Sequence, residues 1–417
     1  MNNKILNIGI FGFGVVGEGL YKILKQTPTL QSNIKRIVIK HPDKKRVAPP
    51  EIFTALANEV LYDETIDIIV ELIDDAEAAY HIVTTALKNG KPVVSANKKL
   101  IAEHLPELLQ LQKQYGTPFL YEASACASIP IIRNLEEYYD NDLLQSIAAI
   151  VNGSTNFILT KMFNENLEFV DALLLAQQLG FAERNPSLDI LGIDAANKLT
   201  ILLLHAYGIV CAPSNLLFTG IQNIQLSDAA FATEKNYQIK LIAKAIKLKN
   251  GKVATYLLPQ FVNKNSPLYA VNNEYNGIVI ESGFSDQQFF YGKGAGSFAT
   301  ASAVLSDIAA LRYQYKYEYK KLQNNNTTTV TNQYYLKVFV SYDSIKQIDK
   351  LAFEWIEEFH AGQTRSYLVG VICAEKLLAN EWWKQQGVSL IVASDSIIED
   401  IDYRAIKAKS LELAGVA

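Results

Sequence analysis

The sequence predicts an α/β protein with an N-terminal Rossmann-type parallel sheet, an α+β middle domain and a small C-terminal α+β domain. Three observations predict this organisation. Segments typical of strands and of helices alternate up to about residue 120, as they do in βαβ units around a parallel sheet. A glycine-rich turn follows the first strand-like segment. A polar segment at 323–333, QNNNTTTVTNQ, has no apolar face and is typical of a linker that precedes a last domain.

The elements of each domain follow from runs of apolar residues and from their spacing. In the first domain, 1–121, we expect strands at 5–11, 36–40, 65–73, 91–95 and 118–121, and helices at 15–25, 77–89 and 102–115. In the second, 122–296, we expect a strand at 147–151, helices at 156–164, 169–179 and 193–207, and strands within 253–291. In the third, 334–417, we expect strands at 334–342, 366–373 and 390–393, with a helix at 348–359.

Composition excludes several classes of protein. A net charge of -4 gives no global reason to expect nucleic acid or an anionic membrane as a partner. The three cysteines lie far apart and form neither a disulfide framework nor a CxxC pair, which favours a reducing, cytoplasmic compartment. No apolar run reaches the ~18 residues of a membrane span. The five histidines are scattered, so the sequence does not predict a histidine-based transition-metal site.

The glycine-rich turn predicts a dinucleotide site. It has the pattern GxGxxG between an apolar strand and a helix, which is the context that supports the motif. The first glycine permits the tight turn, the second lets the backbone approach a pyrophosphate, and the third lets helix and strand pack closely. The candidate cofactor-binding residues of this turn are Gly12, Phe13, Gly14, Val15, Val16 and Gly17.

The end of the second strand bears on the choice of cofactor. An acidic residue there would bind the ribose 2′-hydroxyl of NAD. This sequence instead has Lys40 and His41, followed by Lys44, Lys45 and Arg46. A basic cluster suits a 2′-phosphate, so we predict NADP with Lys40 as a ligand. A solvated charged loop is the alternative, and NAD then stays possible because Asp43 could reach a hydroxyl.

Two charged residues lie on an apolar helix. Asp194 and Lys198 are four residues apart, so they share one face of a helix whose other residues are mostly apolar. A charged pair on a buried helix is costly unless it is functional or well paired. From these residues alone, a functional pair and a structural ion pair are equally good hypotheses.

Four segments, read together, resemble homoserine dehydrogenase. They occur in the family's order and with family-like spacing over about residues 5–311. The segments are SANKKLIA at 95–102, NGSTNFILT at 152–160, GFAE at 180–183 with the following NP, Asp189, Gly192, Asp194 and Lys198, and GKGAG at 292–296 with Thr300. The resemblance implies interconversion of L-homoserine and L-aspartate 4-semialdehyde with NAD(P), and thus a place in threonine and methionine biosynthesis.

The resemblance also implies roles for individual residues. Lys198 is the expected general acid/base, Lys98 is a second candidate, and Asp194 orients the lysine. On the substrate side, Glu183 contacts the α-ammonium with Asp189 beside it, in the segment that begins at Gly180.

On the cofactor side, the resemblance adds Asn97, Lys98 and Gly296 to the expected cofactor-binding residues. A helix at about 297–320 should return to complete the first domain, and the second domain should bind substrate and build a homodimer or homotetramer.

A monovalent cation such as Na⁺ is a further implication. Many members hold one with a glutamate and the backbone carbonyls three, five and seven residues later, which are here Glu122, Ala125, Ala127 and Ile129. The family usually has glycines between them, whereas this chain has Cys126, Ala127 and Ser128, whose Cβ atoms restrict the backbone.

The C-terminal domain resembles a degenerate ACT domain that lacks the usual effector loop, so a threonine response is not expected. Two alternative functions stay open from sequence: another amino-acid or semialdehyde dehydrogenase of the same plan, and a non-catalytic nucleotide sensor. The segment RYQYKYEYKK at 312–321 mixes basic and aromatic residues. We favour an exposed helix end there over a nucleic-acid stripe.

Overall fold

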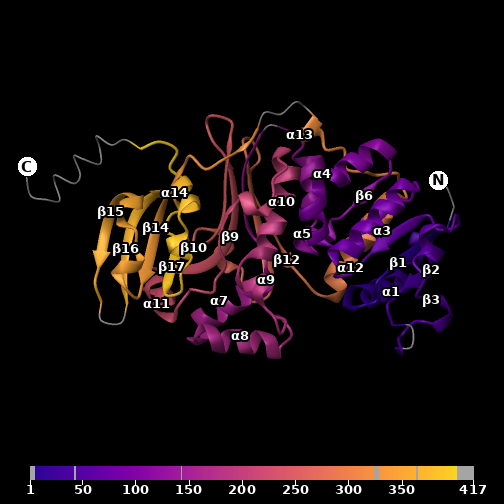
Figure 1. Cartoon of the computed structure of the whole chain (residues 1–417), viewed down its shortest axis with the longest axis horizontal. Helices are drawn as coiled ribbons and strands as arrows, with labels where there is room; N and C mark the ends of the chain where they lie inside the picture. Colours follow the sequence, from indigo (N-terminus) through magenta and orange to yellow (C-terminus); the bar gives the residue numbers. More distant parts are fainter. Residues whose placement is uncertain (1–4, 42–43, 142, 324–327, 363–364, 402–417) are drawn as a thin grey trace, which may run out of the picture.

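Two sheets organise the chain (Figure 1). The structure is a computed structural model that describes residues 5–41, 44–141, 143–323, 328–362 and 365–401. One sheet has six parallel strands in the order β3-β2-β1-β4-β5-β6. The other has eleven strands, nine of them in the order β12-β11-β7-β9-β10-β17-β14-β16-β15, while β8 and β13 pair with β10.

The six-stranded sheet is the predicted Rossmann-type domain. Its central strands are buried on both faces, which is why they read as continuous apolar runs. The strands are β1 Leu6–Phe11, β2 Ser32–Val38, β3 Phe53–Thr54, β4 Ile68–Glu71, β5 Val93–Ser95 and β6 Phe119–Leu120. The helices are α1 Val15–Gln26, α2 Asn58–Leu61, α3 Ala76–Lys88 and α4 Lys98–Tyr115.

A late helix completes this domain. Helix α12, Ser297–Leu311, packs against α1, and Ser297 lies against Gly19 of α1. The predicted helix at about 297–320 is therefore present, but it ends at Leu311. Beyond it, Tyr317 and Tyr319 are buried, and a short helix α13 follows at Lys320–Gln323. The prediction of an exposed helix end over 312–321 was wrong, because these tyrosines bind inward to Tyr121.

The second sheet carries the middle of the chain. Its strands here are β7 Leu144–Ile150, β8 Leu217–Phe218, β9 Tyr237–Lys247, β10 Val253–Asn263, β11 Tyr275–Ser282 and β12 Asp286–Lys293. The longer helices are α7 Gly153–Glu165, α8 Phe169–Gln178, α10 Ile193–Tyr207 and α11 Leu226–Glu234, with short helices α5 Ala123–Cys126, α6 Ile131–Arg133 and α9 Ser187–Ile190. Helices α7 and α10 pack against β9, so one face of this sheet is covered.

The C-terminal strands extend the same sheet. They are β13 Val330–Thr331, β14 Tyr335–Tyr342, β15 Phe353–His360, β16 Ser366–Cys373 and β17 Val388–Val392, with helix α14 at Ala374–Ala379. Strand β17 joins β10 through the pair Gln260 and Val392, and β13 pairs with β10 within the expected linker. The last part of the chain is thus continuous with the middle domain in its backbone pairing.

Several elements, such as helix α11, differ from the sequence-based expectation, and two of them show the reason. The helix expected at 348–359 was wrong, because Phe353–His360 is an edge strand paired with β16. Strand β9 was missed, since Lys240 and Lys244 interrupt its apolar run although both are buried. The ACT-like resemblance is not confirmed, and residues 402–417 of that domain lie outside the described part.

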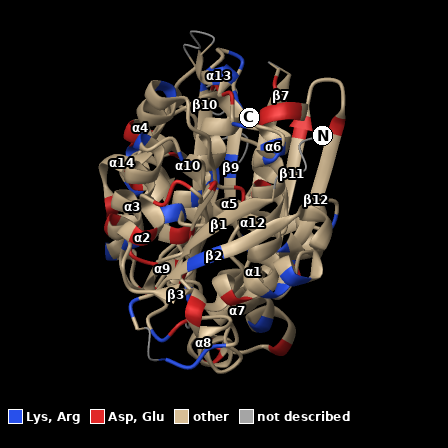
Figure 2. Ribbon diagram, turned by 90° about the vertical axis from the view of Figure 1, so that its right-hand side faces the viewer, with Lys and Arg blue, Asp and Glu red and all other residues tan. Residues whose placement is uncertain are grey.

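None of the helices in the described residues combines the length and apolar character needed to cross a bilayer. Residues of both charge signs are scattered over the view in Figure 2.

The contact between α1 and α12 leads to a stability prediction. A Cβ at Gly19 would lie 2.5 Å from Ser297 Oγ and 2.8 Å from the Ser297 carbonyl oxygen. Gly19→Ala should therefore lower the free energy of unfolding by about 1–3 kcal/mol through overpacking, although alanine favours the helix. Urea unfolding of wild type and variant measures this. Lys22→Ala on the exposed side of α1 is the control, and equal stability of Gly19→Ala and wild type would contradict the close contact.

Candidate active site

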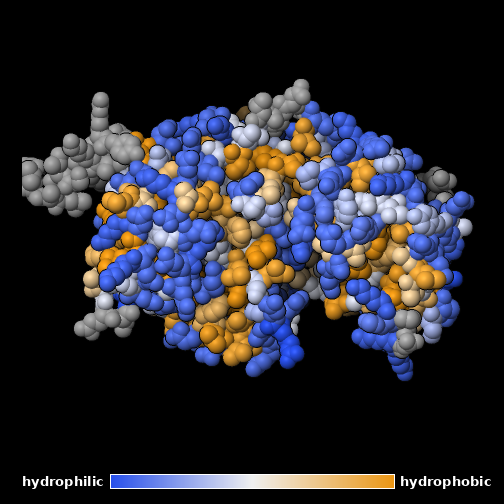
Figure 3. Space-filling model, viewed as in Figure 1, coloured by the Kyte–Doolittle hydropathy of each residue, from blue (hydrophilic) through white to orange (hydrophobic). Residues whose placement is uncertain are grey.

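A cavity of about 610 Å³ lies between the nucleotide domain and the middle domain. The surface in Figure 3 is notched between these two halves of the molecule. Both halves line the cavity, and the polar lining comes from the ends of several elements. The lining includes Val16, Asp74, Lys98, Ala125, Asn152, Gly180, Asp189, Asp194, Lys198, Glu274, Lys293, Gly296 and Thr300.

Asp194 is the buried centre of the polar lining. It lies in the first turn of α10, with Oδ1 2.5 Å from Lys98 Nζ and Oδ2 2.9 Å from Lys198 Nζ. Burial would raise the pKa of Asp194, but the two ammonium groups outweigh it and hold the pKa well below its usual range. The carboxylate therefore stays ionised and fixes two lysines at the cavity.

Asn152 holds two carboxylates in place. Its Nδ2 donates to Asp189 Oδ1 at 2.7 Å and to Asp194 Oδ2 at 2.9 Å. Its Oδ1 accepts from the Thr155 backbone N–H, so the same side chain caps the start of α7. No separate role for Asn152 was predicted from the sequence, although a polar N-cap residue just after a buried strand was a usable signal.

The two lysines occupy different environments. Lys198 is 8% exposed and donates to the Val151 carbonyl oxygen at 2.7 Å. Lys98 is 43% exposed and is the first residue of α4, at the carboxyl edge of the parallel sheet. The charge of Asp194 raises the pKa of Lys98 against the effect of burial, so Lys98 stays an ammonium.

The predicted substrate carboxylates are not equivalent. Asp189 lines the cavity, and burial raises its pKa. Glu183 is exposed and is not among the lining residues, although its charge reaches Lys98 and helps to raise the pKa of that lysine. Gly180 lines the cavity, with a positive φ of 79°.

The glycine turn is built for close backbone approach. Gly12 has φ 98°, and a Cβ there would lie 2.6 Å from the Leu72 carbonyl oxygen. A Cβ at Gly17 would lie 2.6 Å from the Gly12 carbonyl oxygen, whereas nothing lies within 4 Å of one at Gly14. Helix α1 starts at this open position without a side-chain cap. These are the properties that a pyrophosphate at a helix N-terminus requires.

A second helix starts beside the first. Helix α12 begins after Gly296, which has φ 116° and also carries no side-chain cap. Ser297 Oγ donates to the Val15 carbonyl oxygen at 2.6 Å and so joins the two helix starts. Two positive helix ends therefore meet at the cavity edge that holds Val16 and Gly296.

Comparison with known proteins agrees with this geometry. The family model for homoserine dehydrogenase matches residues 130–309, and the model for the homoserine dehydrogenase NAD binding domain matches residues 12–122. A homoserine dehydrogenase of Lactococcus lactis is 32% identical over 96% of this chain and 98% of its own. The chain belongs to the homoserine dehydrogenase family. It is an oxidoreductase with a nicotinamide-binding domain.

Solved structures of homoserine dehydrogenases share the fold. That of Thiobacillus denitrificans has a TM-score of 0.83 and 27% identity, and the match covers 94% of this chain and 99% of that one. A hyperthermophilic archaeal homoserine dehydrogenase mutant in complex with NADPH has a TM-score of 0.63 and 29% identity. That match covers 75% of this chain and 99% of the archaeal one.

Other predicted cofactor residues of this homoserine dehydrogenase lie outside the cavity lining. Phe13 packs edge-on against Tyr21 and Phe53, and Asn97 caps α4 by accepting from the Leu100 N–H. Lys40 is exposed just beyond β2, and its charge helps to lower the pKa of Asp75 after the larger effect of the Ala78 N–H. Asp43, the possible NAD ligand, lies outside the described residues.

The predicted cation residues form a buried loop. Both oxygens of Glu122 accept backbone N–H groups, from Ile132 at 2.8 Å and from Arg133 at 2.9 Å. Burial and then the nearby Asp307 raise the pKa of Glu122 to about 7. Ala127 has φ 42°, and Ile129 O already accepts the Ile131 N–H. The donor set offers one carboxylate and main-chain oxygens, which suits a hard cation.

Glu71 is a buried carboxyl that the sequence analysis missed. It ends β4, where Oε1 accepts the Ile73 N–H at 2.8 Å and Oε2 bonds to Ser95 Oγ at 2.6 Å. These bonds join the ends of β4 and β5, and the next two residues of the chain, Leu72 and Ile73, line the cavity. Burial raises the pKa of Glu71 to about 7 despite them.

Glu71 predicts how stability depends on pH. Its folded-state pKa lies above the ordinary glutamate value of about 4.5, so folding favours the protonated form and stability falls as pH rises from about 4.5 to about 7. Glu71→Gln should remove this part of the slope, worth roughly 3 kcal/mol over the window. Urea unfolding of both proteins between about pH 4.5 and about pH 8 measures it. The exposed Glu51→Gln is the control, and parallel curves for wild type and Glu71→Gln would refute the raised pKa.

Proposed function

We propose that this homoserine dehydrogenase uses Lys198 as the proton donor and acceptor, with Lys98 as an electrostatic partner and NADP as cofactor. The observation that carries the proposal is the convergence of Lys98 and Lys198 on one buried carboxylate at the cavity. The residues present fit a nicotinamide dinucleotide, because two uncapped helix N-termini meet at the glycine turn. When bound, the nicotinamide supplies or accepts the hydride at the carbon that carries the substrate oxygen.

The protein must move one proton at that oxygen. As an ammonium, Lys198 has three N–H donors, of which one reaches Val151 O and one reaches Asp194. The third can face the substrate. In the direction of reduction, Lys198 gives this proton to the oxygen as the hydride arrives at carbon, and in oxidation the neutral amine takes it back. Lys98 stays charged beside it and stabilises negative charge on the oxygen.

The ammonium of the substrate needs carboxylates. Asp189 is held by Asn152 at the cavity wall, and Glu183 lies close enough to act on Lys98. We assign the ammonium to Asp189 and Glu183, with Gly180 beside them in the lining. Asp194 is already neutralised by two lysines, so it positions them and does not bind the ammonium.

The proposal includes two further features of the family. A monovalent cation at Glu122 and the Ala125, Ala127 and Ile129 carbonyl oxygens would stabilise the loop that lines the cavity. We also propose a homodimer through the middle sheet, on the face opposite α7 and α10. In support, β12 presents Phe289 and Tyr291 at 41% and 52% exposure. Exposed aromatic side chains of this kind are enriched at interfaces between proteins.

The proton role of Lys198 is open to direct test. Lys198→Ala should lower kcat by ~10²–10⁴ with a modest change in KM for homoserine, because the lost group acts in the transition state. Initial rates of homoserine oxidation measure this. Lys161→Ala, which removes a lysine from an exposed i,i+4 pair with Glu165, is the matched control. If Lys198→Ala retains wild-type kcat while Lys98→Ala loses it, the proton role belongs to Lys98.

The cofactor preference depends on Lys40. Lys40→Ala should weaken NADP by ~1.5–3 kcal/mol, the scale of one charged hydrogen bond, and leave NAD almost unchanged. Parallel initial-rate assays with both cofactors measure the difference, and added salt should reduce it. Lys35→Ala, on the strand β2 that precedes Lys40 and paired with Asp63, is the control. A wild-type kcat/KM for NAD equal to that for NADP would show that the basic cluster is only a solvated loop.

A further inference from the structure

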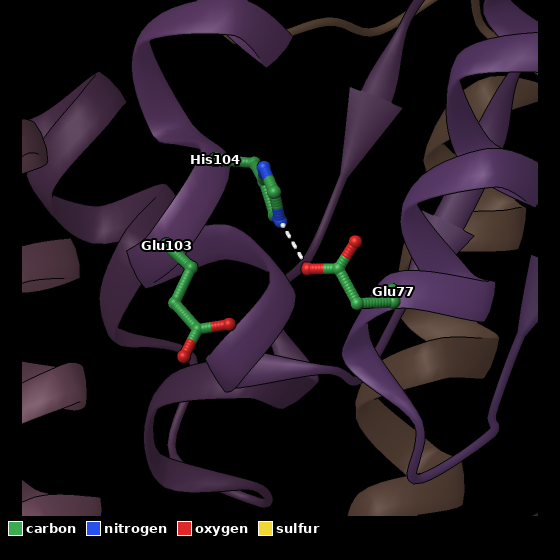
Figure 4. Close-up of side chains that lie close together, drawn as sticks. All are labelled: Glu77, Glu103 and His104. Carbon is green, nitrogen blue, oxygen red and sulfur yellow. Dashed lines mark ion pairs between the residues drawn. The ribbon is translucent and has the colours of Figure 1, made fainter.

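A second group of metal-binding side chains lies away from the cavity, between α3 and α4. It consists of Glu77 in the first turn of α3 and of Glu103 and His104 in α4 (Figure 4). One ligand atom from each, a carboxylate oxygen or an imidazole nitrogen, lies within 4.8 Å of the other two. We call these three residues the α3–α4 cluster.

The distance between His104 and Glu77 fits two ligands of one metal ion. His104 Nε2 is buried and makes no hydrogen bond to the described residues, and Glu77 Oε1 lies 3.4 Å away. This is too long for a good hydrogen bond. Two ligand atoms bound to one tetrahedral Zn²⁺ at ~2.0–2.2 Å are separated by about 3.4 Å. Glu103 is 45% exposed, and its carboxylate oxygen is the third ligand atom of a group that lies within 4.8 Å.

The imidazole is also oriented as a metal ligand would be. Its other nitrogen, Nδ1, faces Glu107 Oε2 at 3.6 Å, and its ring stacks on Tyr80 with centroids 4.2 Å apart. The Tyr80 hydroxyl is itself hydrogen-bonded to Glu107. A carboxylate near the second ring nitrogen is common around a zinc-bound histidine. Here Glu107 lies at ion-pair distance from Nδ1, and the stacking on Tyr80 fixes the ring plane.

The backbone contributes to this orientation. His104 leaves helical geometry, with φ -118° and ψ 15°, and Pro106 follows within the same helix. The departure is confined to the residue whose ring faces α3. Helix α4 starts at Lys98, so a link at His104 would restrain the helix that carries a cavity lysine.

We propose that the α3–α4 cluster binds a divalent transition-metal cation of the Zn²⁺ type, through Glu77, Glu103 and His104 Nε2, with water at the open position. Glu107 acts as the residue that orients His104. The ion ties α3 to α4 and so stabilises the nucleotide domain. The proposal does not depend on the roles assigned to Lys98 or Lys198.

Equilibrium dialysis of the intact chain against Zn²⁺ alone tests the site. Wild type should bind one equivalent more than His104→Gln, and Glu77→Gln or Glu103→Gln should weaken that equivalent at least tenfold. Glu107→Gln should weaken it by about tenfold, as expected for an outer partner. Zn²⁺ should also raise the midpoint of thermal unfolding of wild type and not that of His104→Gln.

The matched control is His81→Gln, which removes an exposed histidine from α3 and should bind Zn²⁺ as wild type does. Circular dichroism without metal shows that the variants are folded. Equal zinc stoichiometry and affinity in wild type and His104→Gln would overturn the proposal. So would unchanged affinity in both Glu77→Gln and Glu103→Gln, because the cluster would then be a surface ion pair only.

Discussion

The burial of the Asp194 carboxylate is the constraint on which the cavity depends. A carboxylate withdrawn from water is tolerated only if charges and donors replace its hydration. Here the charges and the donor come from Lys98, Lys198 and Asn152. These residues lie at the start of α4, within α10 and at the N-cap of α7. Because Lys98 comes from the nucleotide domain and the other two from the middle domain, the same ion pairs join the two walls of the cavity. The need to neutralise Asp194 therefore positions the two lysines and also holds the nucleotide domain against the middle domain.

Glycines set how closely the walls approach each other. At Gly153 a Cβ would lie 2.5 Å from the Glu274 carbonyl oxygen, and at Gly19 one would meet Ser297. The first contact brings Glu274 to the cavity beside α7, and the second brings α12 beside α1. Both bring together segments that are far apart in the sequence. In each case the missing side chain lets two backbones meet, and the lining residues then follow from the positions of the backbones.

Two strands show where the local pattern of apolar residues does not predict secondary structure. The residues at 348–359 have helical spacing, yet Phe353–His360 pairs with β16 at the edge of the large sheet. Its exposed Glu357 and Glu358 are charges of the kind that keep an edge strand from pairing with other chains. For strand β9 the error was a missed strand. Lys240 is buried there because it donates to Val271 O and Asn272 Oδ1, and no local pattern reveals these bonds. In both cases strand pairing outweighed local propensity, because β15 pairs with the following strand β16, and β9 pairs with the following strand β10 and with β7.

The sequence by itself determined the parallel nucleotide domain, the glycine turn and the shared face of Asp194 and Lys198. These depend on local geometry: a strand followed by a tight turn, and a spacing of four on a helix. Only the tertiary structure decided that Lys98 reaches Asp194, that Asn152 serves two carboxylates, that Glu183 lies outside the cavity lining, and that His104 faces Glu77. Such distances join segments that are remote in the chain. They depend on how helices pack on sheets, which residue spacing does not encode.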